Sequence, residues 1–520
     1  MAKLTSFSKF LITLLIIGGA YLGIQYALKN TDAGKSLSEK AKTDSGGGSS
    51  LFGGGKKDKN TIGVGVVTWG GYAGGQYWNR GFEANTQSRF YQDHGFKVEF
   101  KVLDDPTASR NAWKNDEVQL LWATIDALPT EMSGLADYDP VVLFQADWSR
   151  GGDAIVSRRG INNVSDLRGK KVAVAELSPS HSFLIWLLNA GGMTLRDIQL
   201  VSVPSPIEAA DAFKSNSVDA AVVWSPFDEE CIQKVPGARI LQSTRSASNI
   251  IADVFIAKRQ WVNENRERIQ QLYDGWMKGA AEINTNPAAK QEAAQILADA
   301  FDGFTKADAL GAIDNVRLCT HGDNLNFFGI NREYRGVTGE ELYTRMTKEY
   351  RAAGVVSASD IVPSWSKVAY YGAVERSTLS GPAQAAEGQK AFASLKDSAA
   401  KEKEAVAVKR VSISFRTGEY LLDENAKYIV DNEMAPIAKA FAASRIRVEG
   451  NTDDVGSREA NIALSKRRAQ SVVDYLVSEY NMPRNRFIVV GNGPDKPVES
   501  NSTEGGKAKN RRTDFMLIEE

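Results

Sequence analysis

The N-terminal part of the chain is dominated by one apolar, uncharged segment, Phe10 to Leu28. As a helix rising about 1.5 Å per residue it spans about 28 Å, close to the apolar thickness of a bilayer. Lys3 and Lys9 precede the segment, so we expect residues 1–9 to be a cytoplasmic tail and residues 10–28 an uncleaved transmembrane signal anchor. A cleaved signal peptide is the alternative, but it has a shorter apolar core and a small-residue cleavage site.

Short apolar segments alternate with amphipathic segments from residue 61 to about residue 375. Thr61 to Val67, Lys171 to Val174 and Val218 to Val223 are three of the apolar segments. This alternation is typical of α/β layering with parallel strands, so residues 61–375 are expected to form one large α/β domain.

A different pattern occupies residues 411–520, where an α+β domain is expected. Ile446 to Gly450 alternates apolar and polar residues, as a half-buried strand does, and Asn451 to Gly456 is a polar loop. Ser457 is a suitable cap for a helix that follows. The apolar residues of that helix recur at a spacing of three to four and predict its buried face: Ala469, Val472, Val473, Leu476 and Tyr480.

Two linkers separate these parts. Residues 29–60 are rich in Gly, Ser and Lys and cannot bury enough apolar surface to fold. Residues 376–410 are rich in Ala, Lys, Glu and Gln and predict a partly helical spacer, especially from Ala385 to Ala407.

Composition and charge exclude several classes of function. The 520 residues leave room for two or three domains, and 63 basic against 64 acidic residues give no case for nucleic-acid binding. Cys231 and Cys319 are far apart in sequence, and a disulfide between them is possible but not expected. No Cys/His spacing typical of a metal site, no Gly-x-Ser-x-Gly elbow and no Walker loop occurs. We therefore expect neither a metal, nor a cofactor, nor an enzyme.

Several motifs in the C-terminal region occur in an order that resembles the OmpA-like peptidoglycan-binding module. Phe415 to Gly418, followed by Leu421, fits the family's opening strand. The other motifs are Glu449 to Gly456, Asn461, Leu464-Ser465, Arg468-Ala469 and Asn510-Arg511-Arg512. The resemblance implies binding to the cell wall of a diderm bacterium.

Within this resemblance, Asp453 and Arg468 match the positions that hold the diaminopimelate of uncrosslinked wall peptides. A carboxylate suits the ammonium group of that ligand, and a guanidinium clamps its carboxylate with two parallel bonds. The alternative is an ordinary exposed ion pair, worth about 0–1 kcal/mol. Asn451 stands where the family usually has histidine. The remaining candidates for the wall site are Thr452, Asn461 and Arg512.

The large domain resembles the periplasmic solute-binding proteins of ABC importers, in the nitrate, sulfonate, taurine and thiamine-precursor branch. The matching segments are Asp166 to Val174, Ser178 to His181 and Val218 to Phe227. The resemblance implies lobe one at residues 61–150 and 255–375, lobe two at 152–252, and crossovers near Gly152-Asp153 and Ala252-Asp253. One relative makes a thiamine pyrimidine with a Cys-rich loop, which this chain lacks.

Ligands of such folds bind outside the carboxyl ends of the strands. Ser178 and Ser180 lie at an expected helix N-terminus, which favours an anion, although Ser178 is also simply a good helix cap. His181 fits an ordinary helix residue better than a ligand contact. Asp126 and Asp253 either take an amine or tie down a loop, and the tryptophans either stack on a ligand or belong to the core. The full set of solute candidates is Thr68, Trp69, Tyr72, Thr124, Asp126, Trp148, Ser178, Ser180, His181, Trp224 and Asp253.

Together these patterns predict a single-pass inner-membrane protein with most of the chain in the periplasm. The first hypothesis is a domain that binds or senses a small, anionic organic solute near an inner-membrane protein partner, while the OmpA-like domain holds peptidoglycan. The second is a structural or stress-response tether whose two-lobed domain is a protein-docking scaffold. A polar cleft floor flanked by Trp69, Trp148 and Trp224 favours the first hypothesis. A cleft filled by its own side chains favours the second.

Overall fold

The computed structural model describes residues 58–393, 403–413, 415 and 418–519. The chain divides into two units, Met1–Lys59 and Asn60–Glu520. The expected anchor at residues 10–28 and nearly all of the linker at 29–60 lie outside the described residues. Among the helices that are described, none is both long and apolar enough to cross a bilayer.

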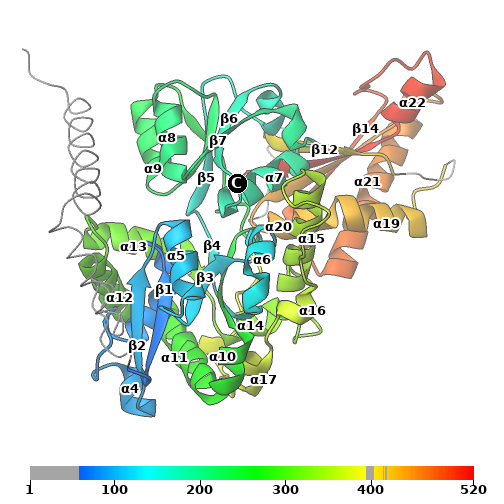
Figure 1. Cartoon of the computed structure of the whole chain (residues 1–520). Helices are drawn as coiled ribbons and strands as arrows, with labels where there is room; N and C mark the ends of the chain where they lie inside the picture. Colours follow the sequence, from blue (N-terminus) through cyan, green and yellow to red (C-terminus); the bar gives the residue numbers. More distant parts are fainter. Residues whose placement is uncertain (1–57, 394–402, 414, 416–417, 520) are drawn as a thin grey trace, which may run out of the picture. The chain divides into compact units, whose positions relative to one another are not determined.

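Lobe one is built on a mixed six-stranded sheet of order β11-β4-β10-β3-β1-β2. β1 pairs in parallel with β2 and β3 (Figure 1). β10 runs antiparallel to both β3 and β4. All ten residues of β4 are buried, so this strand lies in the core of lobe one. The strands are β1 Thr61–Val66, β2 Lys97–Val102, β3 Leu120–Thr124, β4 Pro140–Ser149, β10 Ala252–Lys258 and β11 Val316–Leu318.

Helices cover this sheet, and several start at residues suited to capping. Asp105 and Thr305 accept hydrogen bonds from the first turns of α5 and α13. The helical elements of lobe one are η2 Gly70–Tyr72, α3 Ala73–Trp78, α4 Arg89–His94, α5 Pro106–Lys114, α6 Leu128–Leu135, η3 Ala136–Tyr138, α10 Arg259–Glu264, α11 Arg266–Thr285, α12 Pro287–Ala300, α13 Lys306–Asp314, α14 His321–Phe327, α15 Gly339–Ala352, α16 Trp365–Val368 and α17 Gly372–Arg376.

Lobe two has a five-stranded sheet of order β7-β6-β8-β5-β9. The chain passes between the lobes at residues 150–152 and 244–251, beside the crossovers expected from the sequence. Its strands are β5 Asp153–Ser157, β6 Lys171–Ala175, β7 Gln199–Val203, β8 Ala220–Trp224 and β9 Arg239–Ser243. Its helical elements are η4 Val164–Leu167, α7 Pro179–Ala190, η5 Leu195–Asp197, α8 Pro206–Lys214 and α9 Phe227–Lys234.

The C-terminal domain packs helices on a four-stranded sheet of order β12-β15-β13-β14. The predicted helix forms as α21, Ser457 caps it, and Ala469, Val472, Val473 and Leu476 are buried while Tyr480 is half-buried. The elements are β12 Ala405–Val411, α19 Glu424–Glu433, α20 Ala435–Ala440, β13 Arg445–Asn451, α21 Arg458–Tyr480, η7 Arg484–Arg486, β14 Phe487–Gly493, α22 Glu504–Asn510 and β15 Thr513–Ile518.

The expected spacer at residues 376–410 differs from its prediction. Residues 385–393 form neither helix nor strand, and the first strand of the C-terminal domain is β12, not the segment at Phe415. η6, Pro382–Gln384, packs on lobe one, where the Gln384 side chain donates to Met277 O and accepts from His321 N. Composition favours helix here, but pairing of β12 with β15 and burial of Gln384 determine the structure.

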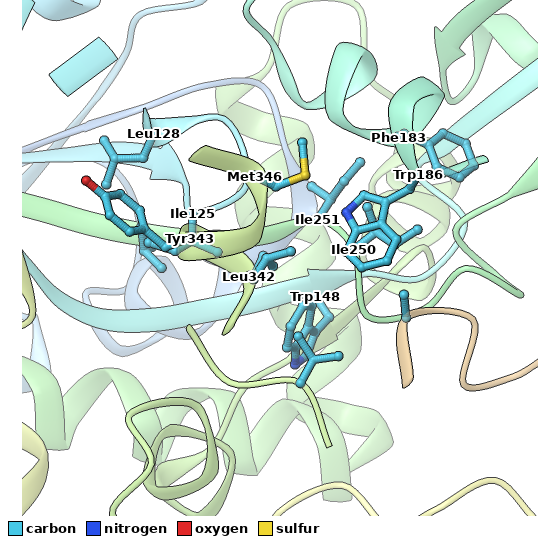
Figure 2. Packing of buried hydrophobic residues seen from close by; sticks show 14 of the residues in the cluster. Ile125, Leu128, Trp148, Phe183, Trp186, Ile250, Ile251, Leu342, Tyr343 and Met346 are labelled. Carbon is cyan, nitrogen blue, oxygen red and sulfur yellow. The ribbon is translucent and has the colours of Figure 1, made fainter. Parts of the chain in front are cut away.

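An apolar cluster joins the two lobes. Phe183 and Trp186 of α7, Met346 and Leu342 of α15, and Ile250 and Ile251 of the crossover belong to one buried cluster (Figure 2). The hydroxyl groups of Ser182 and Tyr350 are 2.7 Å apart within the same contact. The lobes are therefore held closed by buried side chains as well as by their two crossovers.

Candidate functional sites

Three polar side chains form a row across the sheet of lobe one, at the edge that meets lobe two. Asp253 on β10 is directly opposite Thr124 on β3 and Asp147 on β4. Residues directly opposite in antiparallel strands project from the same face. Thr124, Asp253 and Asp147 therefore lie side by side, and none of them is more than 4% exposed.

The segment after β1 covers this row. The Tyr72 hydroxyl donates to Asp253 Oδ2 at 2.6 Å, and the Trp69 indole N–H donates to Asp147 Oδ2 at 3.1 Å. Gly71 and Gly152 leave space for these contacts. A Cβ at Gly71 lies 1.4 Å from Asp147 Oδ2, and one at Gly152 lies 2.0 Å from the Trp69 ring.

We expect Gly152→Ala to destabilise the two-lobed domain by about 1–3 kcal/mol, because the new methyl group displaces Trp69 in a packed region. Gly134→Ala is the matched control. Gly134 lies in α6 with no atom within 4 Å of its added Cβ, so that change should stabilise the chain by about 0.5–1 kcal/mol. Thermal and urea unfolding of both variants measure the difference. Equal stability of the two variants contradicts the packing of Trp69 on Gly152.

Lobe two contributes a second group of polar side chains. Asp153 on β5 is directly opposite Trp224 on β8, and Asp153 Oδ2 accepts from the Ser149 hydroxyl at 2.8 Å. The Ser149 and Thr244 hydroxyls are also 2.8 Å apart, which links the two crossovers. The Trp224 indole N–H donates to Ser180 Oγ at 3.1 Å. Hydrogen bonds of buried polar groups thus run through both connections between the lobes.

Burial changes the titration of these carboxyl groups. It raises the pKa of Asp126 to about 8, although a hydrogen bond to the Ser182 hydroxyl lowers that pKa. It also raises the pKa of Asp153 to about 7. Burial also raises the pKa of Asp147, to which the Asp253 carboxylate adds. The pKa of Asp253 rises by burial too, opposed by the Tyr72 hydroxyl. All four groups favour the protonated form when no cation is near.

These shifts predict that the two-lobed domain loses stability as pH rises from about 6.5 to 8. A raised folded-state pKa means that the folded chain binds more protons than the unfolded chain, so the free energy of unfolding falls with rising pH. Burial lowers the pKa of His181 to about 4. The titration of His181 therefore changes the free energy of unfolding only below about pH 6.5. The thermal midpoint against pH checks this. Asp126→Asn should flatten the slope, and an unchanged slope contradicts the assignment.

The helix N-terminus expected to bind an anion is covered. The Ser178 hydroxyl donates back to Ala175 O at 2.6 Å and does not cap α7. Ser180 and His181 are fully buried, and the His181 ring packs edge-on against Tyr350 at 5.5 Å. α15 therefore lies over the end of the helix that was predicted to face a solute.

Three other solute candidates are not part of the row. Thr68 donates through its N–H and its hydroxyl to Asp104, and so ties down a loop. Trp148 follows Asp147 and projects from the opposite face of the strand, where it packs against Phe327. Asp126 Oδ1 accepts from the crossover amide of Ala252 at 3.4 Å, a weak bond in the buried region beside Asp253.

The site residues predicted from the sequence do not include Asp147, Ser149 and Asp153. Asp147 and Ser149 alternate with Trp148 in a strand whose ten residues are all buried. Polar residues at every second position of such a strand indicate one polar face, and this signal was available.

Two cavities, of about 720 and 800 Å³, lie between residues of the two-lobed and C-terminal domains, and neither is lined by Asp147 or Asp253.

The wall site predicted in the C-terminal domain contains Asp453 at the end of β13. Asp453 Oδ2 accepts from Arg511 at 2.6 Å, and its Oδ1 accepts from Val455 N at 3.2 Å. Arg511 was not among the predicted site residues, although its motif was recognised. The structure therefore gives Asp453 a guanidinium partner from the segment that precedes β15.

Arg468 lies near the middle of α21, not near its start. Its Nε donates to Glu419 O at 3.0 Å, and its guanidinium lies 4.8 Å from the centre of the Phe415 ring. Burial lowers the pKa of Arg468, while Asp453 raises it and Arg511 lowers it, so the three charges are near neighbours. One carboxylate and two guanidinium groups thus border the same region.

Thr452 and Asn461 hold the loop that carries Asp453. The Thr452 hydroxyl donates to Asp453 O at 2.7 Å, and the Asn461 amide donates to Val455 O at 3.0 Å. Asn451 donates to Asp514 and accepts from Asn492, inside a buried network. The residue that replaces the family's histidine therefore supports the sheet beneath the site.

Arg512, a candidate for the wall site, takes part in a buried ion pair instead. It forms an ion pair with Asp514 in which Nε and one Nη each approach a carboxylate oxygen at 3.0 Å, and both residues are buried.

Cys231 and Cys319 are both free and buried. In the described ranges, no three His, Cys, Asp or Glu side chains converge closely enough to hold a metal ion.

Two family profiles match separate parts of the chain. The OmpA family matches residues 414–511, and the NMT1-like family matches residues 147–298. The first match contains Asp453, Arg468 and Arg511. The second begins at Asp147 and contains all of lobe two.

Curated relatives match over parts of their length. Outer membrane porin F of Pseudomonas aeruginosa is 37% identical over 105 residues, 20% of this chain and 30% of that protein. The peptidoglycan-binding protein ArfA of Mycobacterium tuberculosis is 39% identical over 92 residues, 18% of this chain and 28% of that protein. A Brucella abortus protein described as a binding protein is 25% identical over 199 residues, 38% of this chain and 60% of that protein.

Solved structures align with about three fifths of the chain. The aliphatic sulphonate binding protein SsuA of Escherichia coli has a TM-score of 0.47 and 16% identity, and covers 61% of this chain and 99% of its own. The nitrate-binding protein NrtA of Synechocystis has a TM-score of 0.44 and 14% identity, and covers 58% of this chain and 83% of its own. The chain therefore combines a segment that matches the NMT1-like family with a C-terminal segment that matches the OmpA family.

Proposed function

We propose that this protein holds peptidoglycan through its C-terminal domain. The observation that carries the proposal is the carboxylate of Asp453 bordered by the guanidinium groups of Arg511 and Arg468. A free amino-acid end of a wall peptide presents one ammonium and one carboxylate, which these groups complement. The relative ArfA, described as peptidoglycan-binding, supports the proposal.

The test is co-sedimentation of the full-length chain with purified sacculi. We expect the chain to pellet with sacculi, and free diaminopimelate to release it, because the amino acid competes for Asp453 and Arg468. Cadaverine, which has two ammonium groups on a similar carbon chain but no carboxylate, is the matched competitor and should release less protein. Pelleting that diaminopimelate leaves unchanged would contradict the assignment.

We further propose that the two-lobed domain binds or senses a small organic solute outside the cytoplasm. Its polar row between two lobes, flanked by Trp69 and Trp224, supports this role. The apolar segment at residues 10–28 is proposed to anchor the chain in the inner membrane, near a protein partner there. The anionic character predicted for the solute rested on the N-terminus of α7, which α15 covers.

A structural tether is the second candidate. The observation that favours it is the apolar contact between α7 and α15, which closes the lobes on each other (Figure 2). Native mass spectrometry of the purified full-length chain separates the two candidates. A bound small molecule supports solute binding, and a chain of bare mass that no solute stabilises supports the scaffold.

A further inference from the structure

Four buried carboxyl groups, those of Asp126, Asp147, Asp153 and Asp253, occupy the region where the lobes meet, and none is more than 4% exposed. Buried carboxylates in proteins are normally paired with a cation. No lysine or arginine of the described residues forms an ion pair with any of the four. The nearby guanidinium groups of Arg110 and Arg150 are paired with Glu131 and Glu387.

Two atoms beside Asp253 also have no hydrogen-bond partner among the described residues. They are Thr124 Oγ1 and Asp147 Oδ1, and both residues are at least nine-tenths buried. Because each residue is directly opposite Asp253, both side chains project into the same row. A buried hydroxyl and a buried carboxylate oxygen without a partner leave acceptor sites for a donor to fill.

The flanking side chains suit an organic group. Trp69 and Trp224 are each half-buried, and each uses its indole N–H on a polar group, at Asp147 and Ser180 respectively. An indole ring favours a cation over its face. An anion in the same place meets four carboxyl groups, and the guanidinium groups of Arg110 and Arg150 are already paired with glutamates.

From this arrangement we propose that the two-lobed domain binds a small organic cation, with an ammonium or amidinium group against Asp147 and Asp253 and its body beside Trp69 and Trp224. The cation is organic because no set of three ligating side chains in the described chain fits a metal ion. This inference rests on the proposed solute-binding role, and it replaces the anion expected from the sequence.

The first arm of the test measures the chain without ligand. Asp147→Asn keeps an acceptor for Trp69, and Asp253→Asn keeps one for Tyr72, while each removes a buried carboxylate next to another. Each change should raise the thermal midpoint by about 2–4 °C at pH 8. Asp323→Asn is the control, because Asp323 is buried but pairs with Arg317 and caps α14, so its loss should lower the midpoint. Lower midpoints for both Asp147→Asn and Asp253→Asn overturn the proposal.

The second arm uses probes of matched shape and opposite charge on the full-length chain. Benzamidine and tryptamine are compared with benzoate, indole-3-acetate and ethanesulfonate. We expect the two cations to raise the midpoint of the wild type and not of Asp147→Asn. Stabilisation by the anions that persists in Asp147→Asn overturns the cation and leaves solute binding intact. If no probe binds and native mass spectra show a bare chain, the solute-binding role itself fails.

Discussion

Replacing either Asp453 or Arg468 with alanine should weaken binding of the chain to sacculi by about ten- to a hundredfold. Each change leaves one charged group of the wall peptide desolvated without its partner, at a cost of about 1–3 kcal/mol. The double variant should lose less than the sum of the two single losses, because both residues act on one ligand. Arg468→Lys should not restore binding, since lysine lacks the planar pair of donors. Co-sedimentation over a range of sacculus concentrations measures these losses.

Asp454→Ala is the matched control for that series. Asp454 is the next residue in the same loop, but it is exposed, so its loss should leave binding to sacculi unchanged. Circular dichroism of each variant shows whether the domain remains folded. Full binding by folded Asp453→Ala, or an equal loss for Asp454→Ala, refutes the wall site at Asp453.

Arg512→Ala should instead unfold or strongly destabilise the C-terminal domain, by about 3–5 kcal/mol. Burial already raises the pKa of Asp514, and the neighbouring guanidinium of Arg512 opposes that rise. Removing Arg512 leaves a buried carboxylate without its ion-pair partner. Arg512→Met combined with Asp514→Asn removes both charges, and should recover part of the stability. Chemical unfolding of the full-length chain measures both variants. An unchanged C-terminal transition in Arg512→Ala refutes the structural role.

Hydrophobic periodicity was sufficient to predict one strand and the long helix of the C-terminal domain. Ser457 and the apolar positions from Ala469 to Leu476 predicted α21 because a single amphipathic helix depends on local spacing. The same reasoning failed at Ala405 to Val411. Val406, Val408 and Val411 favour strand there, and β12 pairs with β15, which lies about a hundred residues later in the chain. Pairing over such a distance is not visible in local composition.

The candidate sites were only partly predictable, for a related reason. The rule that ligands bind outside the carboxyl ends of strands depends on topology alone. It correctly placed Tyr72, Thr124 and Asp253 near one another. Trp148 was misplaced because the face of a strand from which a residue projects depends on register. The covering of His181 by Tyr350 depends on α15, about 170 residues away. Arg511, at the end of α22, pairs with Asp453, whereas Arg512 pairs with Asp514 of β15.

The contact between α7 and α15 has a kinetic consequence. Separating the lobes exposes Phe183, Trp186 and Met346 to water, and each such side chain adds about 1.5–3 kcal/mol to the barrier when it is fully uncovered. Every 1.4 kcal/mol of barrier slows escape about tenfold. The solute proposed to bind between the lobes would therefore leave far more slowly than one in an open cleft. Long residence suits a stationary reservoir or a detector of past exposure, rather than a carrier that loads and unloads repeatedly.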